Sequence, residues 1–220
     1  MTKLTLILTL ILAAGLASAQ SDVLINEVDA DTDGTDILEF VELYGDAGAP
    51  LDGLVLVFYN GNGDVSYDAF DLDGFALDGS GFFLLGNAGV VPTPSIIFAS
   101  NGLQNGADAV ALHVGDGADF PTGTAVTTTN LIDAVVYDTN DADDAGLLAL
   151  LLPGEPQLNE GGGGNSAAHS NMRCPDGGGG ARVTTSFYQF LPTPGVSNNL
   201  ACEPVADERM SWGGLKSQYR

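Results

Sequence analysis

Short apolar runs alternate along this chain with clusters of Gly, Asp and Asn. The runs are rich in Val, Ile, Leu, Phe and Tyr, which favour strands, and the clusters between them have the composition of turns. The predicted strands are residues 23–28, 39–44, 54–59, 66–72, 81–85, 95–99, 109–114 and 131–137. Eight short strands separated by turns predict an all-β sandwich or barrel and do not fit alternating strands and helices.

Two kinds of segment depart from the strand pattern. Residues 143–152 place acids before an apolar run that ends at Pro153, which predicts one short helix capping an end of the sandwich. Two four-glycine runs, 161–164 and 177–180, are expected to be too flexible to hold fixed chemistry. Residues 166–174 between them are predicted to form an exposed strand or an ordered loop.

The first residues have the features of a secretory signal peptide. Lys3 precedes an apolar stretch over residues 4–12, and small residues lead to Ala19. This pattern predicts removal of residues 1–19 and export of the rest, with residues 20–202 forming one sandwich domain that is secreted or held at the cell surface. An uncleaved membrane anchor is the alternative, disfavoured because the stretch is short and no stop-transfer flank follows.

Composition adds a strong negative charge to this picture. The chain has 6 Lys and Arg against 29 Asp and Glu, a formal net charge of −23 at pH 7. Such a chain repels phosphate backbones, so direct nucleic-acid binding is not expected. The acidity suits a calcium-rich or salty medium, or it serves solubility alone. Apolar residues make up 45% of the chain, enough for a core, and no later apolar run is long enough to predict a membrane span.

The chain has two cysteines, Cys174 and Cys202. In an oxidising compartment they predict a disulfide. A reactive thiol is the alternative, and it lacks support because no obvious base stands beside either residue.

Five segments in order form a distinctive pattern. They are Leu24-Ile25-Asn26-Glu27-Val28, Glu39-Phe40-Val41-Glu42-Leu43-Tyr44, Gly81-Phe82-Phe83-Leu84-Leu85, Ile132-Asp133-Ala134-Val135-Val136-Tyr137-Asp138, and Pro192-Thr193-Pro194-Gly195 with Asn198. Over about residues 22–199 the chain resembles the bacterial lamin-tail domain, with residues 169–173 where that family shows a strand of Ser-x-x-Arg character. The resemblance implies an immunoglobulin-like β-sandwich that acts as an interaction module in secreted or surface proteins.

The acids after the first predicted strand are the strongest candidate for a metal site. Their alternation followed by Gly34 reproduces the first half of a calcium loop, but Phe40 stands where an EF-hand needs Glu. We therefore predict a calcium loop of another type, with a solvated acidic turn as the alternative. The predicted ligands are Asp29, Asp31, Asp33, Asp36 and Glu39.

Two other polar clusters are ambiguous. Residues 60–64 alternate Asn and Gly before Asp64, which fits a calcium loop but fits a hairpin turn better. The acids of residues 138–144 can likewise serve only to start the following helix. The two histidines, His113 and His169, have no metal-site spacing, and His113 is expected to face solvent. No motif of a hydrolytic triad is present, so we predict no catalysis.

Residues 203–220 are predicted to form a flexible tail with a possible role in recognition or sorting. If this tail is helical, Trp212, Leu215 and Tyr219 share one face. A frayed terminus is the alternative reading.

These observations predict a non-catalytic module for binding, adhesion or envelope association, with an extracellular protein or polysaccharide as partner and calcium as a stabilising ion. Two alternatives stay open: an accessory subunit of a secreted nuclease or phosphoesterase, and a metal-dependent hydrolase acting through Asp29, Asp31 or Asp33.

Overall fold

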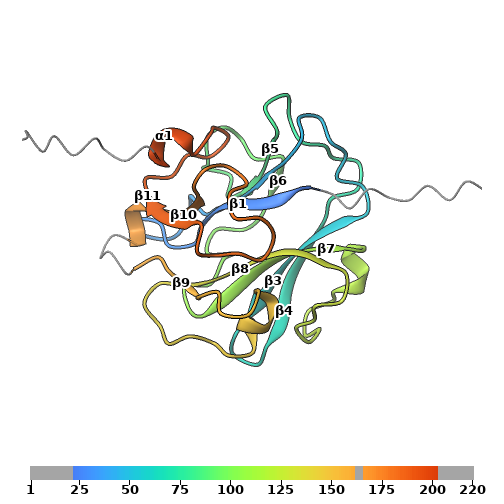
Figure 1. Cartoon of the computed structure of the whole chain (residues 1–220), viewed down its shortest axis with the longest axis vertical. Helices are drawn as coiled ribbons and strands as arrows, with labels where there is room; N and C mark the ends of the chain where they lie inside the picture. The colour runs from blue at the N-terminus through green and yellow to red at the C-terminus, as the bar shows by residue number, and fades with distance from the viewer. Residues whose placement is uncertain (1–21, 162–165, 203–220) are drawn as a thin grey trace, which may run out of the picture.

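A computed structural model describes residues 22–161 and 166–202, and they form two packed β-sheets (Figure 1). The six-stranded sheet has the order β11 (Phe187–Phe190), β10 (Ser170–Arg173), β1 (Leu24–Asp29), β2 (Phe40–Tyr44), β5 (Phe82–Gly86) and β6 (Ile96–Ile97). The five-stranded sheet has the order β4 (Val65–Asp71), β3 (Leu54–Asn60), β7 (Asp108–Val114), β8 (Leu131–Asp138) and β9 (Leu158–Asn159). Neighbouring strands are antiparallel except at one edge of each sheet, where β6 pairs in parallel with β5 and β9 pairs in parallel with β8.

The core lies between the sheets because alternate side chains of each strand point to opposite faces. On β3, Leu56 and Phe58 enter this core, whereas Val55 and Val57 face outward. The outward set is also buried, and part of its cover is η2 (Leu147–Leu150), a turn of 3₁₀ helix. Both faces of β3 are therefore apolar, which explains its continuous hydrophobic run.

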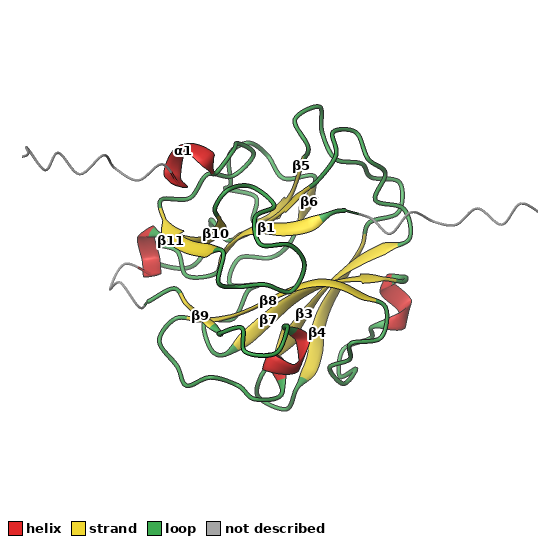
Figure 2. Cartoon of the chain, viewed as in Figure 1, coloured by secondary structure: helices red, strands yellow, loops and turns green. Residues whose placement is uncertain are grey.

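All eight predicted strands are present, and the all-β sandwich is confirmed. Figure 2 shows how little helix accompanies them. The remaining helical turns are η1 (Gly117–Asp119), η3 (Ser166–Ala168) and α1 (Asn199–Cys202). The helix predicted over residues 143–152 is shorter than expected. Asp144 Oδ1 accepts hydrogen bonds from the backbone of Gly146 and Leu147, and Leu151 is already extended, so only one turn fits.

Residues 166–174 were predicted to form an exposed strand or an ordered loop. A strand is present there, but it is not exposed. All four residues of β10 are buried, because β10 lies between β1 and β11 inside the sheet. The neighbouring strand β11 and the short edge strand β9 were not predicted.

The predicted disulfide is confirmed. Cys174 follows β10, and Cys202 ends α1, with the two Cα atoms 5.3 Å apart. The bond fastens the end of the described chain to the end of β10, which lies next to the edge strand β11. Across residues 22–161 and 166–202, no helix is both long and apolar enough to cross a membrane.

Candidate functional site

The outer face of the six-stranded sheet carries carboxyl groups that bind the chain segment after β11. Glu27 on β1 accepts hydrogen bonds from the backbone N–H and the hydroxyl of Thr193, both at 2.9 Å. Glu42 on the neighbouring β2 accepts one from the Gly195 N–H at 2.6 Å. We call residues 192–198 the C-terminal strap. The two glutamates hold the strap against the sheet, so their carboxyl oxygens are used in hydrogen bonds within the protein.

Burial shifts the protonation of both glutamates. It raises the pKa of Glu27 to about 7, even though hydrogen bonds from Ser170 and Thr193 favour the charged form. Burial, together with the nearby Glu27 charge, raises the pKa of Glu42 to about 8. Two buried carboxylates side by side repel each other, so at neutral pH the pair retains at least part of a proton.

Asp29 is the next outward residue of β1, two positions beyond Glu27. Its side chain is 4% exposed, and its Oδ1 accepts no hydrogen bond from any described residue. Burial, reinforced by nearby acids, raises its pKa to about 9. The neighbouring Glu160 is similar, with a pKa raised by burial and by the Asp29 charge to about 10. Glu160 differs because it accepts hydrogen bonds from Asp31 N and Asn171 Nδ2, both at 3.2 Å.

A hollow of about 510 Å³ opens beside Asp29. Asp29 is paired directly with Phe40 across β1 and β2, and both side chains point away from the core that Val28 and Val41 enter. The walls of the hollow are largely apolar: Leu38, Phe40, Val90, Val91, Pro192 and Pro194. Thr32 also lines it, is 6% exposed, and has an Oγ1 without a hydrogen-bond partner within the described residues. An apolar hollow with two unpaired polar oxygens is suited to a ligand that has both kinds of group.

The five predicted calcium ligands do not all meet in this hollow. Asp29 and the exposed Asp33 line it. Asp36 instead accepts a hydrogen bond from Thr32 N at 2.8 Å, and Glu39 accepts from Gly102 N and Leu103 N. The half-buried Asp31 uses its backbone N–H to bind Glu160. Calcium at these residues stays a prediction, and the hydrogen bonds of Asp36 and Glu39 disfavour it. Within the described ranges, no group of three His, Cys, Asp or Glu is arranged to hold a metal ion.

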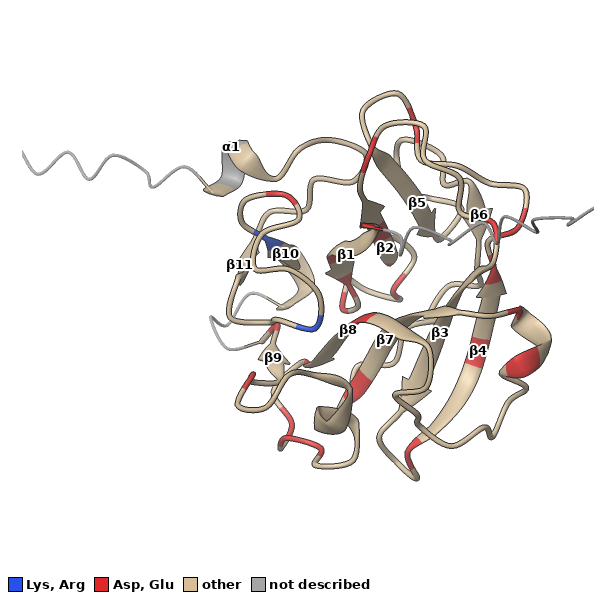
Figure 3. Ribbon diagram, turned by 45° about the vertical axis from the view of Figure 1, so that its right-hand side comes forward, with Lys and Arg blue, Asp and Glu red and all other residues tan. Residues whose placement is uncertain are grey.

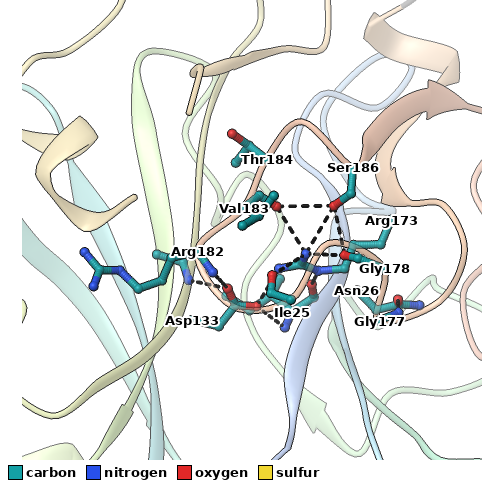
Figure 4. A network of polar contacts seen from close by, with 12 residues as sticks. Ile25, Asn26, Asp133, Arg173, Gly177, Gly178, Arg182, Val183, Thr184 and Ser186 are labelled. Carbon is teal, nitrogen blue, oxygen red and sulfur yellow. Dashed lines mark hydrogen bonds and ion pairs between the residues drawn. The ribbon is translucent and has the colours of Figure 1, made fainter. Parts of the chain in front are cut away.

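A buried ion pair that sequence reasoning missed joins the two sheets. Arg173 Nη2 on β10 lies 2.8 Å from Asp133 Oδ2 on β8, and both side chains are fully buried. Arg173 Nε donates to Ile25 O at 2.7 Å, and Nη1 donates to the carbonyls of Gly178 and Gly180 (Figure 4). The guanidinium also lies over the Phe187 ring, 4.6 Å from its centroid. Every part of this cation is satisfied internally, so it serves the fold and is not accessible to a ligand.

The expectation that the second glycine run is too flexible for fixed chemistry is wrong. The carbonyls of Gly178 and Gly180 accept hydrogen bonds from Arg173 Nη1, and Gly177 N donates to Asn26 Oδ1 at 3.0 Å. Glycine is suited to this position because Gly177, Gly179 and Gly180 have positive φ angles, which L side chains rarely adopt.

His113 does not face solvent, contrary to expectation. It is fully buried, its Nδ1 lies 3.2 Å from Thr129 O, and its Nε2 lies 3.4 Å from the Tyr59 hydroxyl. Burial lowers its pKa. The predicted signal peptide and the tail residues Trp212, Leu215 and Tyr219 lie outside the described residues.

Several of the residues that carry the lamin-tail resemblance are linked by hydrogen bonds. Glu27 and Glu42 contact the strap, Asn26 Nδ2 donates to Glu42 Oε1 at 3.1 Å, and Asn198 Nδ2 donates to Arg173 O at 3.2 Å. Comparison with protein-family models gives no match to this chain, and comparison with curated proteins gives none either. The resemblance therefore rests on these residues alone.

Proposed function

We propose that this protein is an exported, non-catalytic binding module of the lamin-tail type, with an immunoglobulin-like sandwich, and that the hollow beside Asp29 is its ligand site. The observation that carries the proposal is the buried Asp29 Oδ1, unpaired among the described residues, in an otherwise apolar hollow. A buried polar atom without a partner is costly to a fold, so its retention supports a role in binding. The disulfide supports an oxidising, extracytoplasmic location.

The ligand group that best fits the hollow is a lysine or arginine side chain of an extracellular protein. Its aliphatic stem can pack against Leu38, Val90 and Pro192, while its charged end reaches Asp29, which gives up its proton as the ion pair forms. The surroundings favour a cation, because acidic residues are scattered over the strands and loops whereas the two described arginines lie near β10 (Figure 3). A positive group would be attracted over a long range, and both of these arginines are already bound to backbone carbonyls.

A polysaccharide fits the hollow less well. Sugar rings are commonly bound by stacking on an exposed aromatic face, but Phe40, the aromatic residue in the hollow, is only 1% exposed. The accessory and hydrolase alternatives gain no specific observation from the described residues.

The test is titration of the exported protein with two blocked pentapeptides, followed by NMR chemical shifts. One peptide has a central lysine, and the other has norleucine, which keeps the stem and lacks the charge. We expect the lysine peptide to shift resonances around Thr32 and Val90 and to bind at least 10-fold more tightly than the norleucine peptide. Asp29→Asn should remove that preference, whereas the exposed Asp46→Asn should keep it.

Equal binding of the two peptides would show that the hollow recognises apolar groups alone. Absence of shifts around the hollow would overturn the site.

A further inference from the structure

Two turns that the sequence left ambiguous meet at one end of the five-stranded sheet. The Asn60–Gly63 turn connects β3 to β4, and the acidic segment that includes Asp141 and Asp144 follows β8. Together with Gln104 and Asp108, at the entrance to β7, they line a hollow of about 440 Å³. This second hollow is polar, unlike the one beside Asp29, and its lining is dominated by carboxyl and amide groups.

The most informative residue of this polar hollow is Asp108. It lines the hollow although its side chain is only 2% exposed. Its Oδ1 accepts a hydrogen bond from Gly61 N at 3.1 Å, while its Oδ2 accepts none from the described residues. A buried oxygen with spare capacity beside other acids points to a positively charged ligand.

A second pair of carboxyl groups adjoins the hollow. Asp64 lies within hydrogen-bonding reach of Asp144, and its buried Oδ1 has no partner of its own in the described chain. Glycine at position 146 leaves room for this pair, because a Cβ there would collide with the Asp64 carboxyl. Two acidic side chains are therefore held close together beside the hollow.

No protein cation neutralises these acids within the described ranges. Arg173 is paired with Asp133. The Arg182 side chain donates hydrogen bonds to the carbonyls of Ala149, Leu150 and Leu151. Close carboxylates without a counterion must either keep a proton or bind a cation.

From this geometry we propose that the polar hollow is a calcium site, distinct from the loop of residues 29–39, in which the unpaired Asp108 Oδ2 binds the ion together with the carboxylates of Asp141 and Asp144. Calcium accepts six to eight oxygen ligands in flexible geometry, including carboxylates, amides, backbone carbonyls and water. The described residues include no group of three His, Cys, Asp or Glu already arranged to hold a metal ion, so the exposed Asp141 must move toward the ion as it binds, and backbone carbonyls and water complete the shell.

The donor set selects calcium over other common ions. The hollow is lined by oxygen donors and contains neither His nor Cys, which zinc prefers. Magnesium requires near-ideal octahedral geometry at short distances and retains its water, so ligands on three separate loops suit it less well. The site would join the β3–β4 turn, the segment before β7 and the segment after β8.

The experiment is calorimetric titration of calcium into the EDTA-washed exported protein, combined with thermal unfolding. We expect a dissociation constant of about 0.1–1 mM, typical of extracellular calcium modules. At about ten times that concentration, calcium should raise Tm by roughly 3–6 °C, and magnesium should have a smaller effect.

The matched variants are Asp144→Asn with Asp141→Asn, and Asp31→Asn with Asp33→Asn. Asparagine at position 144 can still accept the hydrogen bonds that start η2, so the fold should survive. The first double variant should bind calcium at least 10-fold more weakly, and the second should bind it normally. The proposal is overturned if the wild-type protein binds no calcium, or if the second pair abolishes binding and the first does not. Neither result bears on the lysine-peptide test, which depends on Asp29.

Discussion

At the scale of single residues, Arg173 is a fully buried cation that joins the two sheets and the second glycine run. It connects β10 to β8 through Asp133 and holds the second glycine run through its carbonyls. Removing one member of a buried ion pair leaves the other without compensation, which typically costs about 3–5 kcal/mol. Its contribution can therefore be measured by a double-mutant cycle.

We expect Arg173→Met to lower the free energy of unfolding by about 3–5 kcal/mol, measured by urea denaturation. Combining it with Asp133→Asn should cost less than the sum of the two single changes, because the buried charge is then also removed. Arg182→Met is the control. Its side chain donates only to carbonyls and should cost about 1 kcal/mol. If the free-energy losses of Arg173→Met and Asp133→Asn were strictly additive in the double variant, the two side chains would not be coupled.

At the scale of elements, the strap connects the fold to the proposed binding site. Glu27 holds Thr193 and Glu42 holds Gly195 by hydrogen bonds. Pro192 and Pro194, which alternate with these two residues along the chain, line the hollow beside Asp29. The wall of the hollow is thus positioned by hydrogen bonds to the sheet. Weakening those bonds should affect both stability and binding.

Thr193→Val keeps the shape of the side chain and removes the hydroxyl that donates to the buried Glu27. We expect a loss of about 1–3 kcal/mol in unfolding free energy and several-fold weaker binding of the lysine peptide. Thr122→Val, whose exposed hydroxyl bonds only Tyr67 O, is a control that should change neither. Normal peptide binding by a destabilised Thr193→Val protein would show that the strap does not shape the site.

Elements also show what the sequence can and cannot predict. The eight predicted strands are marked by local apolar runs, so they could be recognised without knowing their partners. The burial of β10 could not be predicted, because Ser170-Asn171-Met172-Arg173 is polar and is buried only through partners far along the chain, such as Asp133. β11 was missed altogether. Asp29 was a candidate because acidic residues surround it in the sequence. The hollow beside it could not be predicted, since its apolar walls bring together residues 38–40, 90–91 and 192–194. The polar hollow was missed for the same reason: residues 60–64 and 138–144 were each recognised as polar clusters, but the sequence does not show that they lie side by side.

At the scale of the whole molecule, many carboxyl groups share one feature, a pKa raised by burial. The values are about 7 for Glu27, Glu39 and Asp108, about 8 for Glu42, about 9 for Asp29 and about 10 for Glu160. In the unfolded chain these groups ionise near pH 4. Between pH 4 and about 8 the folded protein therefore binds more protons than the unfolded one. Since stability then falls as pH rises, the protein should be more stable in mild acid than at alkaline pH.

We therefore expect the urea midpoint in EDTA to fall steadily from about pH 5 to about pH 8, opposite to the usual behaviour of proteins with ion-paired carboxylates. Glu42→Gln should flatten the slope between about pH 4.5 and pH 8, since glutamine can still accept the Gly195 hydrogen bond without ionising. The exposed Asp46→Asn should leave the slope unchanged. Calcium should flatten the slope as well, because an ion bound in the polar hollow displaces the Asp108 proton and stabilises the charged form. A midpoint that rises through this range would mean that the buried acids are ionised in the folded protein and stabilised by groups outside the described residues.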